Sequence, residues 1–322
     1  MYNVGIIGLG HVATHQIAAI EESSDFRLLA GCDPDTSRHK VLDRSVTAYA
    51  RVEELLGHSD LDVVVIASPN RLHVEHGLQV LAADKWLFME KPLAETREEF
   101  DLFAEKKQEL SGNCTLALHA AFGLEMEWFC RHKDDHKARV CDMNTFAAEF
   151  YDPYVEDGHP LPRAASLGGS WMDSGINALS VVCRLIDAQD LVMCSSQMTR
   201  DEDTDCLELE GRVDFEFTRP VVSGKGVIST SWITGRDKKL TTLGFESSGR
   251  TIVLDHSEQR VILREDKKDH LLYACNNDMS RLTNHYIGAF KDLAKQMKTG
   301  KDNFEYCQQL HRLLYQAESW PG

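Results

Sequence analysis

A glycine-rich turn near the start of the chain is the feature that most limits the folds available to it. The apolar run Val4–Leu9 is typical of a buried strand, and Ala13–Glu22 is expected to form a helix. The segment Gly8-Leu9-Gly10-His11-Val12-Ala13 therefore joins a strand to a helix. Glycines at such a turn let backbone N–H groups approach a pyrophosphate at the N-terminus of the helix. We expect a dinucleotide cofactor to contact Gly8, Gly10, His11 and Val12.

An acidic residue follows the next predicted strand. The strand Arg27–Cys32 ends immediately before Asp33, which lies 20 residues beyond Ala13. A carboxylate at that distance is suited to accept hydrogen bonds from both ribose hydroxyls and to repel a 2′-phosphate. Arg38, which follows closely, could instead receive that phosphate. The expected cofactor is NAD, with NADP tolerated, and we expect both Asp33 and Arg38 to contact it.

The first 119 residues continue this alternation of strands and helices. Strands are predicted over Leu61–Ala67, Trp86–Met89 and Thr115–Leu118, and helices over Val74–Ala83 and Thr96–Leu110. Alternation of this kind is typical of βαβ units on a parallel sheet. Residues 1–119 are therefore expected to form an α/β domain of the Rossmann type.

Beyond about residue 120 the pattern changes to strands with one solvent-facing side. Val213–Phe217 alternates apolar and acidic residues with period two. Further strands are predicted over Thr145–Tyr151, Val192–Met198, Gly226–Ile233, Leu240–Glu246, Thr251–Leu254 and Arg260–Leu263. An antiparallel meander fits them best, with one helix over Ser174–Ile186 and loops at the charged runs Asp201–Asp205 and Arg264–Asp269. We expect residues 120–322 to form an α+β domain with a large, mostly antiparallel open sheet, whose C-terminal helices can pack back on the first domain.

Charge and composition exclude several classes of partner. The formal net charge of −16 argues against nucleic acid or an anionic membrane surface as the main partner. The nine cysteines include no C-x-x-C pair, so a zinc site is not expected. Apolar runs stay short of the ~18 residues of a membrane span, and the first residues lack the pattern of a signal peptide. A cytoplasmic protein without a metal is the expectation.

Two further motifs carry groups suited to catalysis. Ser68-Pro69-Asn70 and Glu90-Lys91-Pro92 follow neighbouring predicted strands, and ligands of open α/β sheets bind outside such carboxyl ends. Lys91 could stabilise negative charge on a substrate oxygen, or it could be a surface lysine in a turn. Asp173 and Asn177 are four residues apart and can share one face of a helix, although Asp173 could equally be only an N-cap.

Together these segments resemble the Gfo/Idh/MocA family of nicotinamide-dependent sugar dehydrogenases. The resemblance covers essentially the whole chain and implies that Lys91 is catalytic and that Asp173 lies in the active site. Asn177 stands where the family usually has a catalytic histidine. The resemblance also implies a homodimer or homotetramer formed through the open face of the second sheet. Further cofactor contacts are expected at Ser68, Asn70, His73, Glu90 and Lys91.

The departure at Asn177 narrows the expected reaction. The segment Asp173–Ser180 is similar to the corresponding stretch of bacterial L-arabinose and D-galactose 1-dehydrogenases, which oxidise the anomeric hydroxyl of an aldose to a lactone. That hydroxyl is more acidic than a ring alcohol, so a carboxylate can serve as its base. Catalytic residues are then Lys91, Asp173 and Asn177, and substrate contacts are expected at His119, Arg163, Asp173 and Asn177. His119 could alternatively be only a packed side chain.

Three alternatives remain open at this stage. The enzyme could oxidise a ring secondary alcohol, as inositol dehydrogenases do, or hydrolyse glycosides with NAD as some relatives do. A nucleotide-sensing protein without activity ranks last, because Lys91 and Asp173 are both present. Among the other histidines, His132 and His136 are expected at a solvated helix end, and His256, His270 and His285 form no recognisable constellation.

Overall fold

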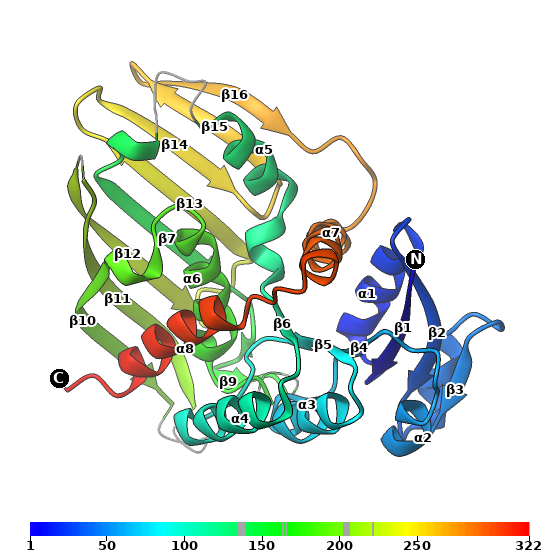
Figure 1. Cartoon of the computed structure of the whole chain (residues 1–322). Helices are drawn as coiled ribbons and strands as arrows, with labels where there is room; N and C mark the ends of the chain where they lie inside the picture. The colour runs from blue at the N-terminus through cyan, green and yellow to red at the C-terminus, as the bar shows by residue number, and fades with distance from the viewer. Residues whose placement is uncertain (134–139, 163, 165, 202–206, 221, 322) are drawn as a thin grey trace. The chain divides into compact units, whose positions relative to one another are not determined.

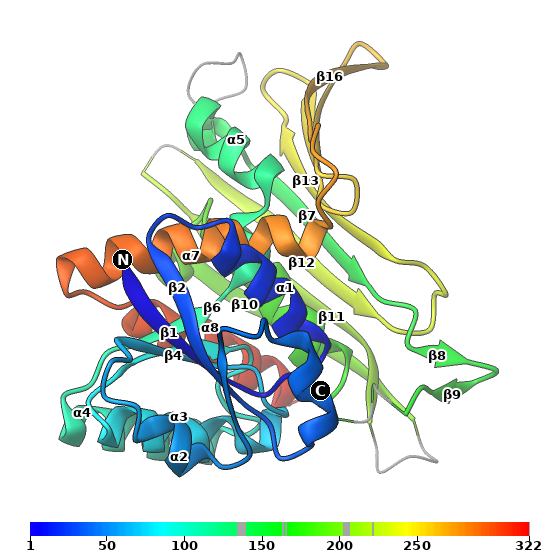
Figure 2. The same ribbon diagram turned by 90° about the vertical axis from the view of Figure 1, so that its right-hand side faces the viewer.

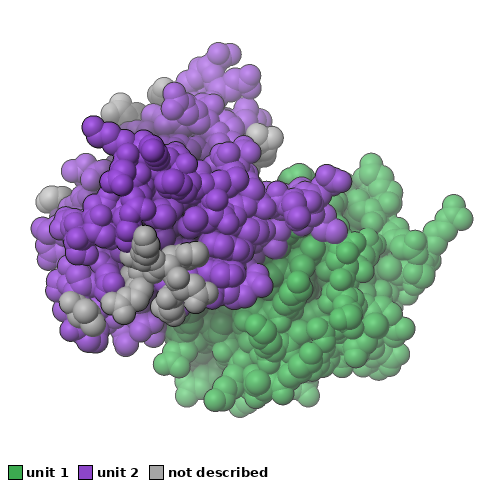
Figure 3. Space-filling model, turned by 90° about the horizontal axis from the view of Figure 1, so that it is seen from above, with its two compact units in different colours: residues 1–119, 282–308 green, residues 120–281, 309–322 purple. Residues whose placement is uncertain are grey.

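The computed structural model describes residues 1–133, 140–162, 164, 166–201, 207–220 and 222–321. Contacts within the chain divide it into two compact units, which Figure 3 colours separately. Unit 1 consists of residues 1–119 and 282–308, and unit 2 consists of residues 120–281 and 309–322. Each unit is built on its own large sheet.

Unit 1 contains a six-stranded parallel sheet in the order β3-β2-β1-β4-β5-β6 (Figure 1). The strands are β1 (Tyr2–Ile7), β2 (Phe26–Cys32), β3 (Thr47–Tyr49), β4 (Val63–Ile66), β5 (Trp86–Glu90) and β6 (Cys114–Ala117). The helices are α1 (His11–Glu21), α2 (Val52–Leu56), α3 (His73–Ala82), α4 (Arg97–Leu110) and most of α7 (Arg281–Thr299). This arrangement confirms the predicted Rossmann-type sheet.

Helices cover both faces of this sheet, which explains its continuous apolar strands. On one face Phe88 of β5 packs against Phe290 of α7, with ring centroids 4.9 Å apart. On the other face Gly77 of α3 lies so close to Met89 that a Cβ there would clash with its side chain. The valines and isoleucine of β4 are fully buried between the two layers. Parallel strands of this kind require burial on both sides.

Unit 2 contains an eight-stranded sheet in the order β10-β11-β12-β7-β13-β14-β15-β16 (Figure 1), which Figure 2 shows from another side. The strands are β7 (Thr145–Tyr151), β10 (Leu191–Arg200), β11 (Glu208–Thr218), β12 (Ser223–Ser231), β13 (Lys238–Phe245), β14 (Arg250–Asp255), β15 (Arg260–Glu265) and β16 (Lys268–Ala274). Helices α5 (Leu124–His132) and α6 (Ile176–Cys183) pack on this sheet, and β8 (Val155–Glu156) pairs with β9 (His159–Pro160) beside it. Helix α8 (Phe304–Glu318) is shared by the two units.

The predicted mostly antiparallel sheet is confirmed, but a simple meander is not. Strand β7 lies between β12 and β13, parallel to the first and antiparallel to the second. Alternation along β7 places Phe146, Ala148 and Phe150 in the core and leaves the intervening side chains partly exposed. A meander was expected because strand patterns carry no information about which strand pairs with which.

Three local predictions need correction. The run Arg264–Asp269 is not a loop: it contains the end of β15, a two-residue turn at Asp266-Lys267 and the start of β16. Both turn residues have positive φ, as tight hairpin turns require. The helix expected from Ser174 begins with a π-helical turn over Trp171–Gly175, and α5 was not predicted. Of the run Asp201–Asp205, residues 202–205 lie outside the described part of the chain.

Candidate active site

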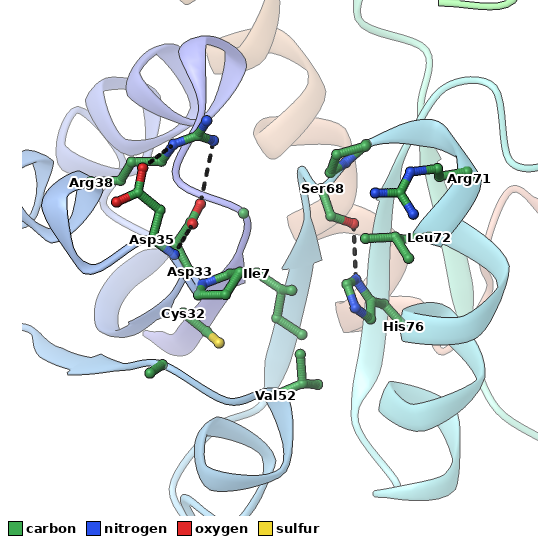
Figure 4. A pocket seen from close by; sticks show the side chains of 14 residues that line it. Ile7, Cys32, Asp33, Asp35, Arg38, Val52, Ser68, Arg71, Leu72 and His76 are labelled. Carbon is green, nitrogen blue, oxygen red and sulfur yellow. Dashed lines mark hydrogen bonds and ion pairs between the residues drawn. The ribbon is translucent and has the colours of Figure 1, made fainter. Parts of the chain in front are cut away.

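A cavity of about 370 Å³ lies in unit 1 beside the glycine-rich turn. Gly8 and Asp33 line it, and so do the side chains of Arg38, Ser68, Arg71 and His76, which are labelled in Figure 4. Arg38 comes from the segment after β2, whereas Ser68, Arg71 and His76 come from the segment after β4 (Figure 4). Gly8 has φ of 92°, and a Cβ there would lie 2.5 Å from the carbonyl oxygen of Ala67, so only glycine fits.

Asp33 connects the glycine-rich turn to the end of β2. One carboxylate oxygen of Asp33 accepts a hydrogen bond of 2.9 Å from the Leu9 N–H, and the other accepts one of 2.9 Å from the Asp35 N–H. The Arg38 guanidinium lies 3.6 Å from the same carboxylate and also pairs with Asp35. Asp33 is therefore held rigidly at the wall of the cavity, where the ribose of a dinucleotide is expected.

The start of α1 is suited to a pyrophosphate. Gly10 is its N-cap and provides no side-chain hydrogen bond, so the first N–H groups of the helix are not capped by a side chain. A Cβ at Gly10 would meet only the Arg38 guanidinium, at 3.8 Å, so space remains above this helix end. His11 is exposed in the first turn, next to the ring of His15. These features fit a dinucleotide phosphate group.

The segment after β4 is fixed by histidines, one of which the sequence analysis missed. The His73 ring is buried, and its two nitrogens lie 2.7 Å from the Pro92 carbonyl oxygen and 2.9 Å from that of Ser68. His73 thus ties this segment to the Glu90-Lys91-Pro92 turn, and a direct contact with the cofactor stays a prediction. His76 lies in the wall of the cavity and bonds the Ser68 hydroxyl at 2.9 Å. Burial lowers the pKa of His76.

Glu90 is the last residue of β5, and Lys91 follows it directly. Glu90 is buried, and one of its carboxylate oxygens accepts hydrogen bonds from the Tyr286 hydroxyl at 2.5 Å and from the Gln16 amide at 2.6 Å. Burial raises the pKa of Glu90 to about 7, opposed by the Tyr286 hydrogen bond and by the charge of Lys91. Lys91 is partly exposed at the carboxyl end of the strand, where catalysis is expected. The Tyr286 contact was not predictable, because Tyr286 fits the apolar stripe of its helix.

His119 lies beside α7, the helix that contains Tyr286. Its Nδ1 is 3.3 Å from Nδ1 of His285, and its ring centroid lies 5.1 Å from that of Tyr286. The expectation that His285 belongs to no constellation is therefore wrong. A role for His119 in substrate binding stays a prediction.

Asp173 and Asn177 lie together in unit 2. Asp173 belongs to the π-helical turn Trp171–Gly175, a geometry often found at functional sites, and Asn177 belongs to the first turn of α6. Their exposed fractions are 9% and 8%. The Asn177 amide nitrogen donates to the Asp173 carbonyl at 3.3 Å, whereas its oxygen is buried without a hydrogen-bond partner in the described residues. A buried acceptor without a partner costs free energy unless a ligand donates a hydrogen bond to it. Arg163 lies outside the described residues.

A buried network around His256 also escaped the sequence analysis. The His256 Nδ1 lies 2.7 Å from a carboxylate oxygen of Glu125, and its Nε2 lies 2.9 Å from the Thr241 hydroxyl. All three side chains are enclosed, so the network joins α5 to the sheet rather than forming an accessible site.

No group of three His, Cys, Asp or Glu side chains within the described ranges is arranged to hold a metal ion. Nor does any helix found there have the length and apolar character needed to span a membrane.

Comparisons with known proteins agree with this geometry. Residues 2–116 match the Gfo/Idh/MocA family model, described as an oxidoreductase family with an NAD-binding Rossmann fold. Glucose-6-phosphate 3-dehydrogenase of Bacillus subtilis is 27% identical over 121 residues, covering 37% of this chain and 34% of the relative. Inositol 2-dehydrogenase of Salmonella paratyphi B is 28% identical over 109 residues, covering 32% of each protein. The chain thus spans about a third of the length of these relatives.

Similarity of fold extends over nearly the whole chain. An oxidoreductase from Agrobacterium radiobacter, crystallised with NAD+, L-tartaric acid and magnesium, superposes with a TM-score of 0.78. The match covers 96% of this chain and 93% of the other at 14% sequence identity, which shows a shared fold. Unit 1 therefore contains an NAD-binding Rossmann domain, and its residues 2–116 match that of the Gfo/Idh/MocA oxidoreductase family.

Proposed function

We propose that this protein is an NAD(P)-dependent dehydrogenase that oxidises the anomeric hydroxyl of an aldose to a lactone. The observation that carries the proposal is the nearly buried pair of Asp173 and Asn177. This pair combines a carboxylate with an amide oxygen that has no hydrogen-bond partner among the described residues. A sugar hydroxyl could donate to that oxygen, and an anomeric hydroxyl is acidic enough for a carboxylate base. Similarity to sugar and inositol dehydrogenases supports the same substrate class.

When bound, NAD(P)+ would supply the acceptor for the hydride that leaves C1. Asp33 and the uncapped start of α1 would hold its ribose and pyrophosphate. Asp173 accepts the proton of the anomeric hydroxyl. The Lys91 ammonium donates a hydrogen bond to the same oxygen and stabilises its developing negative charge. Lys91 and Asp173 belong to different units, so their action on one oxygen rests on the resemblance of their motifs to those of the family.

Asn177 has a different part in this proposal. An amide cannot take up a proton at neutral pH, so it orients the sugar through hydrogen bonds. Its replacement should affect KM more than kcat, whereas loss of Lys91 or Asp173 should affect kcat.

A panel of substrates tests the assignment to C1. L-Arabinose, D-galactose and other aldoses would be compared with their 1-deoxy analogues and with myo-inositol, each with NAD+ or NADP+, by the absorbance of the reduced cofactor. We expect the aldoses to react and the 1-deoxy analogues, which lack the reacting hydroxyl, to be inert. Equal rates with a 1-deoxy sugar would refute oxidation at C1.

Two other activities of the same fold would give different results. Oxidation of myo-inositol without oxidation of aldoses would indicate a ring alcohol dehydrogenase, in agreement with the inositol dehydrogenase relative. Release of the aglycone from an aryl glycoside in the presence of NAD+ would indicate a hydrolase. Trapping of the product with hydroxylamine would identify a lactone directly.

A further inference from the structure

The helical segment that carries Asp173 and Asn177 lacks a cap of its own. Ser170 precedes the π-helical turn, but its side chain makes no capping hydrogen bond to that turn. A carboxylate from a distant strand occupies this place. Glu208, the first residue of β11, accepts a hydrogen bond of 2.6 Å from the Trp171 N–H and another of 2.9 Å from the Ser170 hydroxyl. Glu208 is only 1% exposed.

The surroundings of Glu208 fix these contacts closely. Ser170 also lies 2.8 Å from the Thr230 hydroxyl of β12, so it is held between two neighbouring strands. Gly169 has φ of 108°, and a Cβ there would lie 3.0 Å from both the backbone oxygen and the carboxylate of Glu208. The carbonyl of the same Gly169 accepts the Asp173 N–H at 3.0 Å. Glu208 is therefore one residue removed, through Gly169-Ser170, from the hydrogen bond that holds the Asp173 backbone.

Charge favours this arrangement as well. A carboxylate at the N-terminus of a helix interacts favourably with the positive end of its dipole. Burial nevertheless raises the pKa of Glu208 to about 7, and the carboxylate of Glu318 raises it further while Arg200 lowers it. The two hydrogen bonds that Glu208 accepts offset part of this cost, and an apolar residue could not make them.

We propose that Glu208 is a positioning residue for Asp173 and Asn177. By accepting the Trp171 N–H and the Ser170 hydroxyl, it sets the start of the π-helical turn and thereby the orientation of both side chains toward the substrate. The inference rests on the proposed function only in that Asp173 must act on the substrate, whichever hydroxyl is oxidised.

Two replacements of Glu208 and one matched control test this role. Glu208→Ala removes both acceptors, whereas Glu208→Gln keeps one oxygen for the Trp171 N–H and lets the Ser170 hydroxyl reorient as an acceptor. Glu216→Gln makes the same change on the same strand, at an exposed residue paired with Lys225. We expect kcat on the best substrate to fall ~10–10²-fold in Glu208→Ala and less in Glu208→Gln, with Glu216→Gln unchanged.

The dissociation constant of NAD+ should stay the same in all three variants, because Glu208 and the nucleotide cavity belong to different units. A primary isotope effect with substrate deuterated at the oxidised carbon should increase in Glu208→Gln, since misplacement of Asp173 slows the chemical step. Amide hydrogen exchange of the peptide 169–177 should become faster in both Glu208 variants and not in Glu216→Gln.

The outcomes separate this inference from the proposed function. If Asp173→Asn is inactive and both Glu208 variants keep wild-type kcat, KM and amide exchange, Glu208 is not a positioning residue. If Asp173→Asn is fully active, the proposed function fails instead. Should Glu208→Ala fail to fold, Glu208→Gln alone decides: a normal isotope effect and normal exchange overturn the inference.

Discussion

Replacement of Tyr286 by phenylalanine tests one hydrogen bond to the Glu90-Lys91-Pro92 turn. The change removes only the hydroxyl that donates to Glu90 at 2.5 Å and leaves the ring against His119. Both residues are buried, so water cannot readily replace the lost donor. Glu90 keeps the Gln16 amide as a donor to the same oxygen.

The size of the effect should depend on pH. Hydrogen bonds to charged groups contribute about 1.5–3 kcal/mol and those between neutral groups about 0.5–1.5 kcal/mol. We therefore expect Tyr286→Phe to lower the free energy of unfolding by about 2 kcal/mol where Glu90 is ionised and about 1 kcal/mol where it is protonated. The difference corresponds to a rise of somewhat less than one pH unit in the pKa of Glu90.

The direction of the pH dependence follows from linkage. Burial raises the pKa of Glu90 from 4.5 to about 7, so its contribution to stability is fully present below pH 4.5 and is lost as the pH rises through about 7. Because Tyr286→Phe raises this pKa further, the wild type and the variant should differ more at about pH 8 than at about pH 5.5.

Urea unfolding of both proteins at the two pH values measures this difference. Tyr2→Phe is the matched control, since Tyr2 lies in the same unit with its ring against Phe26. The control should show the same small effect at both pH values. Equal destabilisation by Tyr286→Phe at both pH values would show that its hydroxyl does not donate to an ionised Glu90.

Three further predictions concern catalysis, cofactor choice and assembly. Lys91→Ala should lower kcat by ~10²–10³, and Asp173→Asn should lower it by a similar or larger factor. NAD+ should still bind to both variants. A near-normal kcat in both would show that other residues carry out the chemistry, and His119 would be tested next. Arg38→Ala should lower kcat/KM with NADP+ by about tenfold and leave kcat/KM with NAD+ nearly unchanged. A wild-type protein that strongly prefers NADP+ would show that Arg38, rather than Asp33, determines the choice of cofactor. We propose that the open face of the unit 2 sheet joins two subunits, so light scattering at micromolar concentration should give a dimer or tetramer. Thr242→Glu, which places a charge opposite Ala147 on that face, should reduce this mass, and a monomeric wild type would exclude the proposed assembly.

Local chemistry made the glycine-rich turn and Asp33 predictable. A strand, a turn that only glycine can make and an acidic residue at a fixed distance all lie within one βαβ unit, so their spacing along the chain determines their spacing in the fold. Alternation likewise predicted β7 and β11, because the period of two reflects which side of the sheet each residue faces.

Contacts between distant segments were not predictable in this way. Glu125 and His256 are 131 residues apart, and Glu90 and Tyr286 are 196 apart, so no local pattern reports that they meet. The same holds for Glu208 and Ser170. Strand β16 was missed for another reason: it lies at the edge of the sheet, where Lys268, Asp269 and His270 are exposed and hide the strand pattern.

The return of residues 282–308 to unit 1 has a consequence for the order in which the protein can form during synthesis. Phe290 of α7 packs against Phe26 and Phe88, and Asp302 and Asn303 accept hydrogen bonds from the backbone of β6. When only the first 119 residues have emerged from the ribosome, every strand of the nucleotide-binding sheet is therefore present. The helix that covers one face of that sheet has not yet been made. Phe88 stays uncovered and Glu90 lacks its tyrosine until residues 120–281 of unit 2, and then α7, have emerged. We expect an isolated fragment 1–119 to aggregate, and addition of a peptide spanning 282–308 to keep it in solution.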